Sequence, residues 1–171
     1  MIKPGDVIAN EDLRKIFKCG LQSGMRRSLR TNSLILVSDH TRGIYKDRWE
    51  GNILYYTGMG LEGQQSLQYA QNKTLAGSNK NGVEVHLFEV FESGRYIYQG
   101  RVKLAGVPFQ EKQLDKNKEE RSVWLFPLKL MDQENPSPIL ENDFSKARMT
   151  REKVIRRLSD EELVKRAKLQ E

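Results

Sequence analysis

Aromatic and charged side chains are interleaved in residues 43–60, GIYKDRWEGNILYYTGMG. A site that inspects one nucleobase needs flat aromatic rings to stack on it and a carboxylate to accept a hydrogen bond from an exocyclic amine. Tyr45, Asp47, Tyr56 and Thr57 supply two rings, an acid and a hydroxyl for the polar edge. The residues alone are equally compatible with a structural role, in which a tyrosine packs in the core and Asp47 belongs to a turn.

Three arginines lie in the segment LQSGMRRSLRTN, residues 21–32, whose serines and glycine predict a loop. Arg26, Arg27 and Arg30 could bind DNA phosphates there, because small neighbouring side chains let a backbone approach closely. Arg42, just before the aromatic segment, is a fourth candidate. The net charge of +6, with 10 basic and 6 acidic residues among the first 60, is compatible with a polyanionic partner. A solvated run of charge is the alternative interpretation.

Other chemistries have weaker support in the sequence. Ser38, Asp39 and His40 are adjacent, and neighbours in sequence rarely converge on one reacting atom. Glu89 and Glu92 lack the following Glu-x-Lys spacing of a metal-dependent nuclease, and residues 57–63 lack the Gly-Lys-Ser/Thr ending of a P-loop. We therefore expect no catalytic residue, no metal and no cofactor.

The composition of the 171-residue chain fits one domain with an appendage. No apolar run approaches the roughly 18–20 residues of a membrane helix, and no secretory signal is present, so no membrane partner is expected. The single cysteine, Cys19, excludes an internal disulfide and leaves a poor ligand set for zinc. These features predict a cytoplasmic protein.

Hydrophobic patterning predicts the elements that must position the candidate residues. Strands are expected over residues 33–39, 53–57, 82–94, 95–106 and 123–130, with Gly51-Asn52 as a turn and His86 on the less buried face of its strand. Helices are expected over residues 10–20, with Asn10 as N-cap and Gly20 as stop, and over residues 62–78. Residues 111–122 predict a charged loop. The fold class is α+β, with a curved, mostly antiparallel sheet or small barrel, flanking helices and a helical tail.

The composition of the sequence changes after residue 131. Two prolines predict a linker, and a Ser159–Glu162 capping box predicts a charged helix that begins near Asp160. We therefore divide the chain into a domain over residues 1–131 and a linker with a charged helical tail over residues 132–171.

The segment 43–60 resembles the central signature of SRA (SET and RING associated) domains: Gly-x-Tyr-x-x-Asp, then Gly-Asn, then Tyr-Thr-Gly-x-Gly. The resemblance covers roughly residues 5–130 and continues through QQSLQYAQNKTLAGSN, GVEVHLFEV and YIYQGRVKL. It implies a curved β-barrel of the PUA-like type that flips a modified cytosine out of duplex DNA into a tyrosine-lined pocket.

The resemblance also implies roles for individual residues. Tyr45 and Tyr56 match the stacking tyrosines, Thr57 matches the pocket threonine, and Asp47 matches the pocket acid with one residue missing from the intervening loop. The remaining pocket positions are filled by Gly43 and Ile44, where family backbone atoms contact the base edge, and by Met59, where eukaryotic members have a small serine near the methyl group. The segment MGLEGQQSL lacks the Asn-Lys-Arg finger of those members, so a preference for hemimethylated DNA is not implied.

The tail sequence RRLSDEELVKRAKLQ is similar to the linker that leads into an HNH nuclease domain in bacterial modification-dependent restriction endonucleases. The resemblance implies that this chain is the DNA-reading half, with the nuclease half absent, and that the full-length protein is an HNH endonuclease. The expected partner is double-stranded DNA carrying 5-methyl- or 5-hydroxymethylcytosine, and a homodimer through the tail or the nuclease domain is a further expectation. A PUA-like RNA-binding module and a reader of another DNA modification are the alternatives.

Overall fold

The structure of the chain, a computed structural model, describes residues 1–43 and 45–137. Its elements are β1 (Val7–Ile8), α1 (Asn10–Phe17), β2 (Met25–Ser28), β3 (Ser33–Asp39), β4 (Arg48–Glu50), β5 (Ile53–Thr57), α2 (Gln71–Ala76), β6 (Glu84–Glu92), β7 (Arg95–Leu104), β8 (Phe109–Leu114) and β9 (Glu120–Leu130). The helices expected in the tail fall on residues 138–171, outside the described residues. Neither described helix has the length and apolar character needed to cross a membrane.

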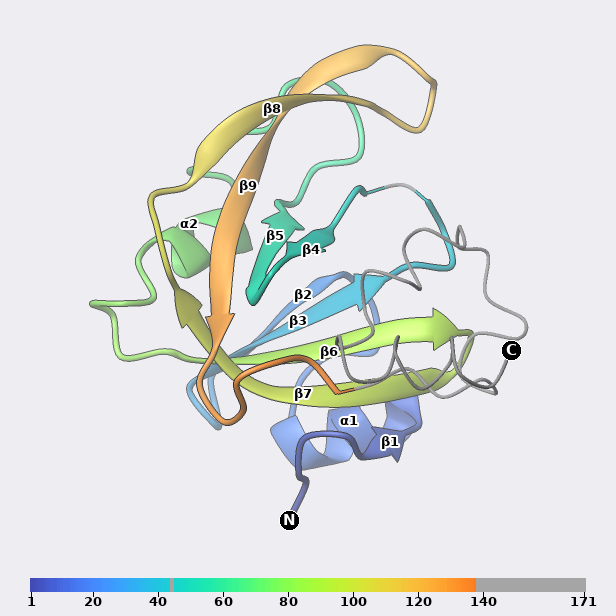
Figure 1. Ribbon diagram of the computed structural model, residues 1–171, viewed down its shortest axis with the longest axis vertical. Coiled ribbons are helices and arrows are strands. Elements are labelled where there is room, and N and C mark those ends of the chain that lie inside the picture. Colours follow the sequence, from blue (N-terminus) through green and yellow to red (C-terminus); the bar gives the residue numbers. More distant parts are fainter. Residues whose placement is uncertain (44, 138–171) are drawn as a thin grey trace, which may run out of the picture.

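The strands form one curved sheet in the order β2-β3-β6-β7-β9-β5-β4, with β1 paired to β7 and β8 paired to β9 (Figure 1). The pairing of β3 with β6 is parallel, and the other described pairings are antiparallel. The predicted fold class is confirmed at this level, as a mostly β mixed sheet with two short helices. Over residues 1–43 and 45–137, β2 and β4 end the strand order without pairing with each other, so the sheet does not form a closed barrel.

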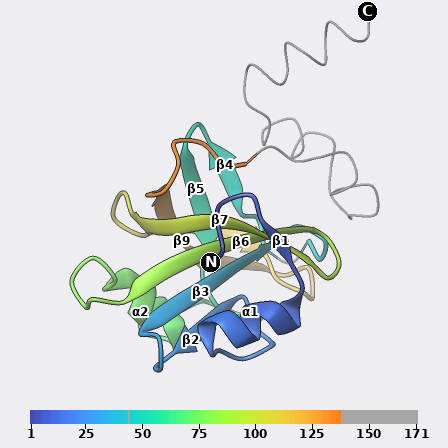
Figure 2. The ribbon, with the colours of Figure 1, turned by 90° about the horizontal axis from the view of Figure 1, so that it is seen from below.

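Both faces of the central strands are covered by apolar side chains. One core contains Leu34 and Leu36 of β3 and lies inside the curve of the sheet against β5 and β9. The other contains Ile35 and Val37, which alternate with them along β3, and packs against Leu13 and Phe17 of α1. Figure 2 shows α1 beside β3, on the side away from β4 and β5. This double coverage explains the continuous apolar run of β3.

The same double coverage corrects the prediction for His86. The β6–β7 hairpin is confirmed, and its turn closes between Glu92 and Arg95. His86 was expected on the less buried face of β6, but it is 7% exposed. Its Nδ1 lies 2.7 Å from the Tyr98 hydroxyl, and its ring centre lies 4.6 Å from that of Phe17. The helix α1 covers the face that strand alternation alone would leave to solvent.

Residues 111–122 form much of the β8–β9 hairpin, so the prediction of a charged loop is wrong. The two strands pair from Phe109↔Leu125 to Leu114↔Glu120. Their charged side chains lie mostly on the exposed side, while Gln113 and Arg121 are 2% and 1% exposed on the inner side. The strand predicted over residues 123–130 is confirmed as most of β9. Buried polar groups on the inner side gave no apolar alternation, which is why β8 and the first residues of β9 were missed.

Pro127 lies inside β9 at a point where the strand changes neighbours. On one side of β9, the pairing with β8 ends at Leu125, and the pairing with β7 begins at Leu128. Pro127 therefore lies between the residues of β9 that pair with β8 and those that pair with β7, a position at which a strand tolerates proline.

The segment around β2 differs from the predicted loop over residues 21–32. Met25–Ser28 pair with β3 from Met25↔Leu36 to Ser28↔Ser33. The helix α1 begins at Asn10 and ends at Phe17, with Lys18 in the left-handed conformation at φ 55°, so Asn10 is not its N-cap and Gly20 is not its stop. The side chain of Asn10 instead accepts a hydrogen bond of 2.5 Å from Arg26 Nη1 and donates to the Leu21 carbonyl.

The predicted helix over residues 62–78 is shorter than expected, because α2 spans only Gln71–Ala76. The residues before it run beside β9, where Gln65 N donates to the Ser122 carbonyl at 3.0 Å and Ser122 N donates to Gln64 Oε1 at 2.7 Å. These tertiary hydrogen bonds hold residues 64 and 65 against β9, outside the predicted helix.

The residues beyond β9 follow β7 as far as the structure describes them. Met131 N donates to the Arg101 carbonyl, Asp132 forms an ion pair of 2.7 Å with Arg101, and Ser137 N donates to Gln99 Oε1. The predicted boundary between residues 131 and 132 stays a prediction, and residues 132–137 contact the sheet.

Candidate functional site

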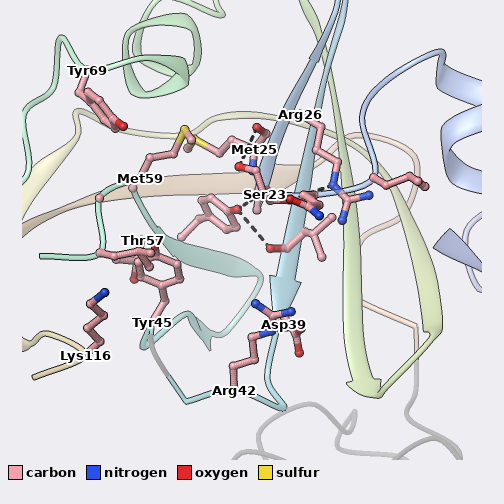
Figure 3. Close-up of a pocket in the computed structure, with 18 of the residues that line it drawn as sticks. Ser23, Met25, Arg26, Asp39, Arg42, Tyr45, Thr57, Met59, Tyr69 and Lys116 are labelled. Atoms are coloured by element: carbon pink, nitrogen blue, oxygen red, sulfur yellow. Dashed lines mark hydrogen bonds and ion pairs between the residues drawn. The ribbon is translucent and has the colours of Figure 1, made fainter.

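A cleft of about 900 Å³ opens at the ends of β3 and β5 (Figure 3). Four of the residues predicted for the base pocket line it: Tyr45, Tyr56, Thr57 and Met59. The loop before β2 and the segment after β5 form opposite parts of its wall. These four residues therefore share one cavity, whereas Asp47 and Gly43 lie outside its described lining.

Tyr56 forms the floor of the cleft and is also part of the core. It is 3% exposed, and its hydroxyl donates to the carbonyls of Gly24 at 2.7 Å and Val37 at 3.2 Å. A Cβ at Gly24 would lie 3.2 Å from this hydroxyl, so a larger residue there would require the tyrosine to shift by a few tenths of an ångström. Burial raises the pKa of Tyr56 well above its ordinary value, so this hydroxyl remains a donor. Tyr56 thereby joins β5 to β3 and to the loop before β2 beneath the cavity.

Tyr45 lies on the wall beside Thr57, as Figure 3 shows, and is half-buried. Burial raises the pKa of its hydroxyl, which also interacts with the Gly60 backbone. Among the described residues, no direct ring contact joins Tyr45 and Tyr56. The two rings are thus separate surfaces of one cleft. The turn at Gly51-Asn52 that was expected to bring these segments together is confirmed, since Glu50 pairs with Ile53.

Asp47 lies directly behind Thr57 and is 6% exposed. Its Oδ1 accepts a hydrogen bond of 2.7 Å from the Thr57 backbone N–H, and its Oδ2 accepts one of 2.8 Å from the Ser38 hydroxyl. Burial raises the pKa of the Asp47 carboxyl, while these two hydrogen bonds oppose the rise. The carboxylate is therefore fixed in orientation next to the cleft.

The backbone around Met59 is held by two buried amide side chains. Asn72 accepts from Met59 N at 2.7 Å and donates to the Met59 carbonyl at 3.1 Å, as a neighbouring strand would do. Gln65 Nε2 donates to the carbonyls of Gly58 at 2.6 Å and Gly60 at 3.1 Å. A Cβ at Gly58 would lie 2.8 Å from Asn72 Oδ1, so this position requires glycine. The sequence analysis assigned no role to either amide, although both lie in the segment QQSLQYAQNKTLAGSN that carries the family resemblance.

Arg121 supports the same segment from behind. Its Nη1 donates to the Gly60 carbonyl at 2.5 Å and contacts the Gly63 carbonyl at 3.3 Å. Gln113 Nε2 lies 3.5 Å from Thr57 Oγ1. The inner side of the β8–β9 hairpin thus braces the wall of the cleft.

The four predicted phosphate-binding arginines occupy different environments. Arg26 lines the cleft, but it is 6% exposed and its guanidinium donates to Asn10 and to the Ser23 carbonyl. Arg42 also lines the cleft, with a side chain that is 74% exposed and an Nε 3.6 Å from Asp39 Oδ2. Arg27 donates to the Ser28 and Ser33 carbonyls, and exposed Arg30 lies at the far end of the β2–β3 hairpin. Only Arg42 combines exposure with a position on the cleft.

Two further predicted pocket positions lie outside the described lining of the cleft, and two residues that were not predicted line it. Gly43 is exposed with φ +68° and is outside the described lining, and Ile44 lies outside the described residues. Tyr69, which is 55% exposed, and Lys116, which pairs with Glu62 at 2.7 Å, line the cleft without having been predicted. Tyr69 lies in the segment predicted as a helix, and Lys116 lies in the segment predicted as a charged loop. Neither prediction indicated that these residues would line the same cleft.

The geometry of Ser38 and His40 does not provide a nucleophile. His40 Nε2 lies 3.4 Å from Ser38 Oγ and 3.0 Å from Glu89 Oε2, so one nitrogen meets both partners. A catalytic relay requires the base to contact the nucleophile and the orienting acid through different nitrogens. Ser38 is also fully buried. Within residues 1–43 and 45–137, no cluster of three or more His, Cys, Asp or Glu side chains could hold a metal ion.

Comparison with known proteins gives one family and several similar structures. The family profile described as "ScoMcrA-like, SRA domain" matches residues 4–145. The search of curated proteins found no match.

Two similar structures contain ScoMcrA. The sulfur-binding and SRA domains of ScoMcrA complexed with phosphorothioated DNA share 21% identity and a TM-score of 0.62, over 82% of this chain and 42% of that chain. The type IV phosphorothioation-dependent restriction endonuclease ScoMcrA shares 18% identity and a TM-score of 0.62, over 81% of this chain and 29% of that chain. The present chain therefore spans less than half the length of either.

A third similar structure is the SUVH5 SRA domain bound to fully hydroxymethylated CG DNA. It shares 21% identity and a TM-score of 0.59, over 81% of this chain and 95% of that chain. At these identities the structural likeness establishes a common fold.

Proposed function

The chain belongs to the ScoMcrA-like SRA domain family, and from this premise we propose that it binds duplex DNA and takes a flipped 5-modified cytosine into the cleft at Tyr45 and Thr57. We further propose that its curved sheet is a variant of the PUA-like barrel. Flipping requires a few kcal/mol of unstacking energy, which contacts inside a pocket must offset. The observation that carries the proposal is the Asp47 carboxylate fixed behind a cleft with two tyrosine surfaces.

The base would stack between Tyr45 and Tyr56, since both rings line the cavity without touching each other. Asp47 would accept the N4 amine. An ionised carboxylate has about four lone-pair positions, and the Thr57 N–H and the Ser38 hydroxyl occupy two of those on Asp47. The Thr57 side chain also interacts with this carboxyl. Thr57 would contact the polar edge, and the backbone at Gly43 and Ile44 would contact the base edge. Met59 would form part of the wall at the 5-substituent.

Phosphate binding is proposed chiefly for Arg42. Arg26 would contribute only if it exchanged an internal acceptor for a phosphate, because its guanidinium already donates to protein oxygens. Arg27 and Arg30 would require DNA to reach beyond the cleft. The positive charge of the chain favours such a polyanionic partner.

The biological role that we propose is the targeting half of a modification-dependent, type IV-like restriction endonuclease, with an HNH nuclease half in the full-length protein. The relationship to ScoMcrA, a type IV restriction endonuclease, supports this role. Dimerisation through the tail or the nuclease half remains part of the proposal.

A binding panel tests the proposal. Duplexes of one sequence would carry one unmodified, 5-methyl-, 5-hydroxymethyl- or glucosylated cytosine, and a further duplex would carry a phosphorothioate. We expect tighter binding to at least one 5-modified cytosine, measured by fluorescence anisotropy at moderate salt. Equal affinity for all cytosine duplexes would refute it. Selective binding of the phosphorothioate would indicate another modification, and stronger binding of single-stranded RNA would indicate an RNA-binding module.

Replacing Arg42 with alanine is expected to weaken binding to modified and unmodified duplexes by the same several-fold factor. Loss of one phosphate contact should also reduce the slope of log K against log salt by about one. Arg30→Ala is the matched control, because Arg30 is exposed but lies away from the cleft. Salt titrations of both variants would measure the slopes, and an equal change in both would contradict a cleft-specific contact.

A further inference from the structure

A chain of buried hydrogen bonds runs behind the cleft from β6 to Asp47. Ser38 Oγ lies 2.8 Å from Asp47 Oδ2 and 3.4 Å from His40 Nε2. His40 Nε2 lies 3.0 Å from Glu89 Oε2. Ser38 and Glu89 are fully buried, and His40 and Asp47 are each 6% exposed. The proposed contact between Asp47 and the base does not explain why so many polar groups are buried in line behind it.

The donor and acceptor roles in this series of hydrogen bonds follow from the contacts of Glu89, at the end far from Asp47. Trp49 Nε1 and Gln99 Nε2 donate to the two oxygens of Glu89, at 3.2 Å and 3.1 Å. Donors on both oxygens are the pattern of an ionised carboxylate, which can only accept. The contact between Glu89 and His40 is therefore assigned to an Nε2–H of the imidazole. A protonated Nε2 has no lone pair to accept a hydrogen bond from Ser38, so the Ser38 hydroxyl donates to Asp47 Oδ2.

The consequence is a carboxylate held at both oxygens by donors from different strands. Thr57 N–H of β5 holds Oδ1, and the Ser38 hydroxyl of β3 holds Oδ2. Without Ser38, the hydrogen bonds to Asp47 would all come from Thr57, through its backbone N–H and its side chain, and the carboxylate could rotate about its Cβ–Cγ bond. Rotation would move the acceptor away from the direction of an exocyclic amine, and hydrogen bonds weaken steeply with misalignment.

We propose that Ser38, oriented by His40 and Glu89, is a positioning residue that aims the Asp47 carboxylate and thereby determines how well the cleft distinguishes an exocyclic amine from a carbonyl. The inference rests on the proposed function, because it assumes that a base enters the cleft. The relevant pair of substrates is 5-methylcytosine and thymine. Both carry the 5-methyl group, but only the former presents an amine where the latter presents an oxygen.

The test compares binding of two duplexes, with 5-methylcytosine or thymine at one position opposite guanine. Ser38→Ala is expected to lower the ratio of the two affinities about tenfold, the size of a lost hydrogen bond to a charged group. Any difference in flipping between the duplexes cancels when variant and wild-type ratios are compared. Ser33→Ala is the matched control, since Ser33 lies on the same strand, is 3% exposed and donates to the Thr31 carbonyl away from Asp47.

A double variant separates positioning from a general structural effect. In the Asp47→Asn background, Ser38→Ala should cause no further loss of the ratio, because the two residues act through one contact. A loss of the same size in both backgrounds, or the same loss in Ser33→Ala, would overturn the proposal. Thermal unfolding shows which variants fold. If Ser38→Ala does not, Ser38→Cys, with a weaker donor, should give an intermediate ratio, and a wild-type ratio would overturn the proposal.

The pH profile of the same ratio gives an independent readout. Asp47 faces Ser38, His40, Tyr45, Tyr56 and the Thr57 backbone, with Glu89 beyond His40. Protonation of Asp47 removes the charged acceptor, so the ratio should fall as pH falls through the pKa of this carboxyl. The Ser38 hydrogen bond lowers that pKa, so Ser38→Ala should move the acidic limb to higher pH. An unmoved limb would overturn the proposal, whereas a wild-type protein without preference for any modified cytosine would instead refute the proposed function.

Discussion

Asp47→Asn is expected to reduce binding of a duplex with 5-modified cytosine about 10- to 100-fold, while binding to unmodified duplex DNA changes little. The Thr57 N–H must still meet an oxygen, so the amide nitrogen of asparagine takes the position of Oδ2 beside Ser38. The variant therefore loses the negative charge and one acceptor together. A hydrogen bond to a charged group is worth about 1.5–3 kcal/mol, which gives this range of affinity.

Asp39→Asn provides the control for this result. Asp39 is a carboxylate that lines the same cleft, but it contacts Thr41 and Arg42 rather than the floor or wall. Its neutralisation should leave the ratio of modified to unmodified binding unchanged. Anisotropy titrations of both variants at one salt concentration would measure the ratios. An unchanged ratio in Asp47→Asn would exclude this carboxylate from base recognition.

Tyr56→Ala is expected to lower the free energy of unfolding by about 3–5 kcal/mol, the usual range for removing a large aromatic side chain from a core. Its ring packs with the inner core, and its hydroxyl holds two carbonyls from β3 and the loop before β2. A domain of this size is stabilised by only about 5–15 kcal/mol, so the variant is expected to be partly unfolded under assay conditions. Loss of base binding in this variant would therefore not isolate stacking.

Tyr56→Phe and Tyr69→Ala make the stability result interpretable. Tyr56→Phe keeps the ring and loses the buried hydroxyl, with an expected loss of about 1–3 kcal/mol. Tyr69 is 55% exposed on the same cleft, and its removal should change stability by less than about 0.5 kcal/mol. Urea unfolding followed by the fluorescence of Trp49 and Trp124 would measure all three variants. Equal stability of Tyr56→Ala and Tyr69→Ala would contradict the placement of Tyr56 in the core.

Several elements of the fold were predictable because their signals are local. The apolar run of residues 33–39, the β-branched and aromatic run of residues 53–57, and the hairpin closed by Ser93-Gly94 all became strands. The elements that were missed depend on distant partners. β2, β8 and the first residues of β9 carry charged side chains, and they are strands because β3 and the 58–65 segment lie against them.

The sequence by itself determined which side chains could bind a base, and it determined the family through their spacing. Only the tertiary structure decided how each is used. Tyr56 is fixed by the carbonyl of Gly24, Asp47 by the hydroxyl of Ser38, and Arg26 by the amide of Asn10. Each partner is distant along the chain, and local patterns cannot report which buried donor will meet which acceptor. A buried polar group must find such a partner, and this requirement places a proposed stacking tyrosine in the core as well as on the cleft and gives a proposed phosphate ligand internal acceptors.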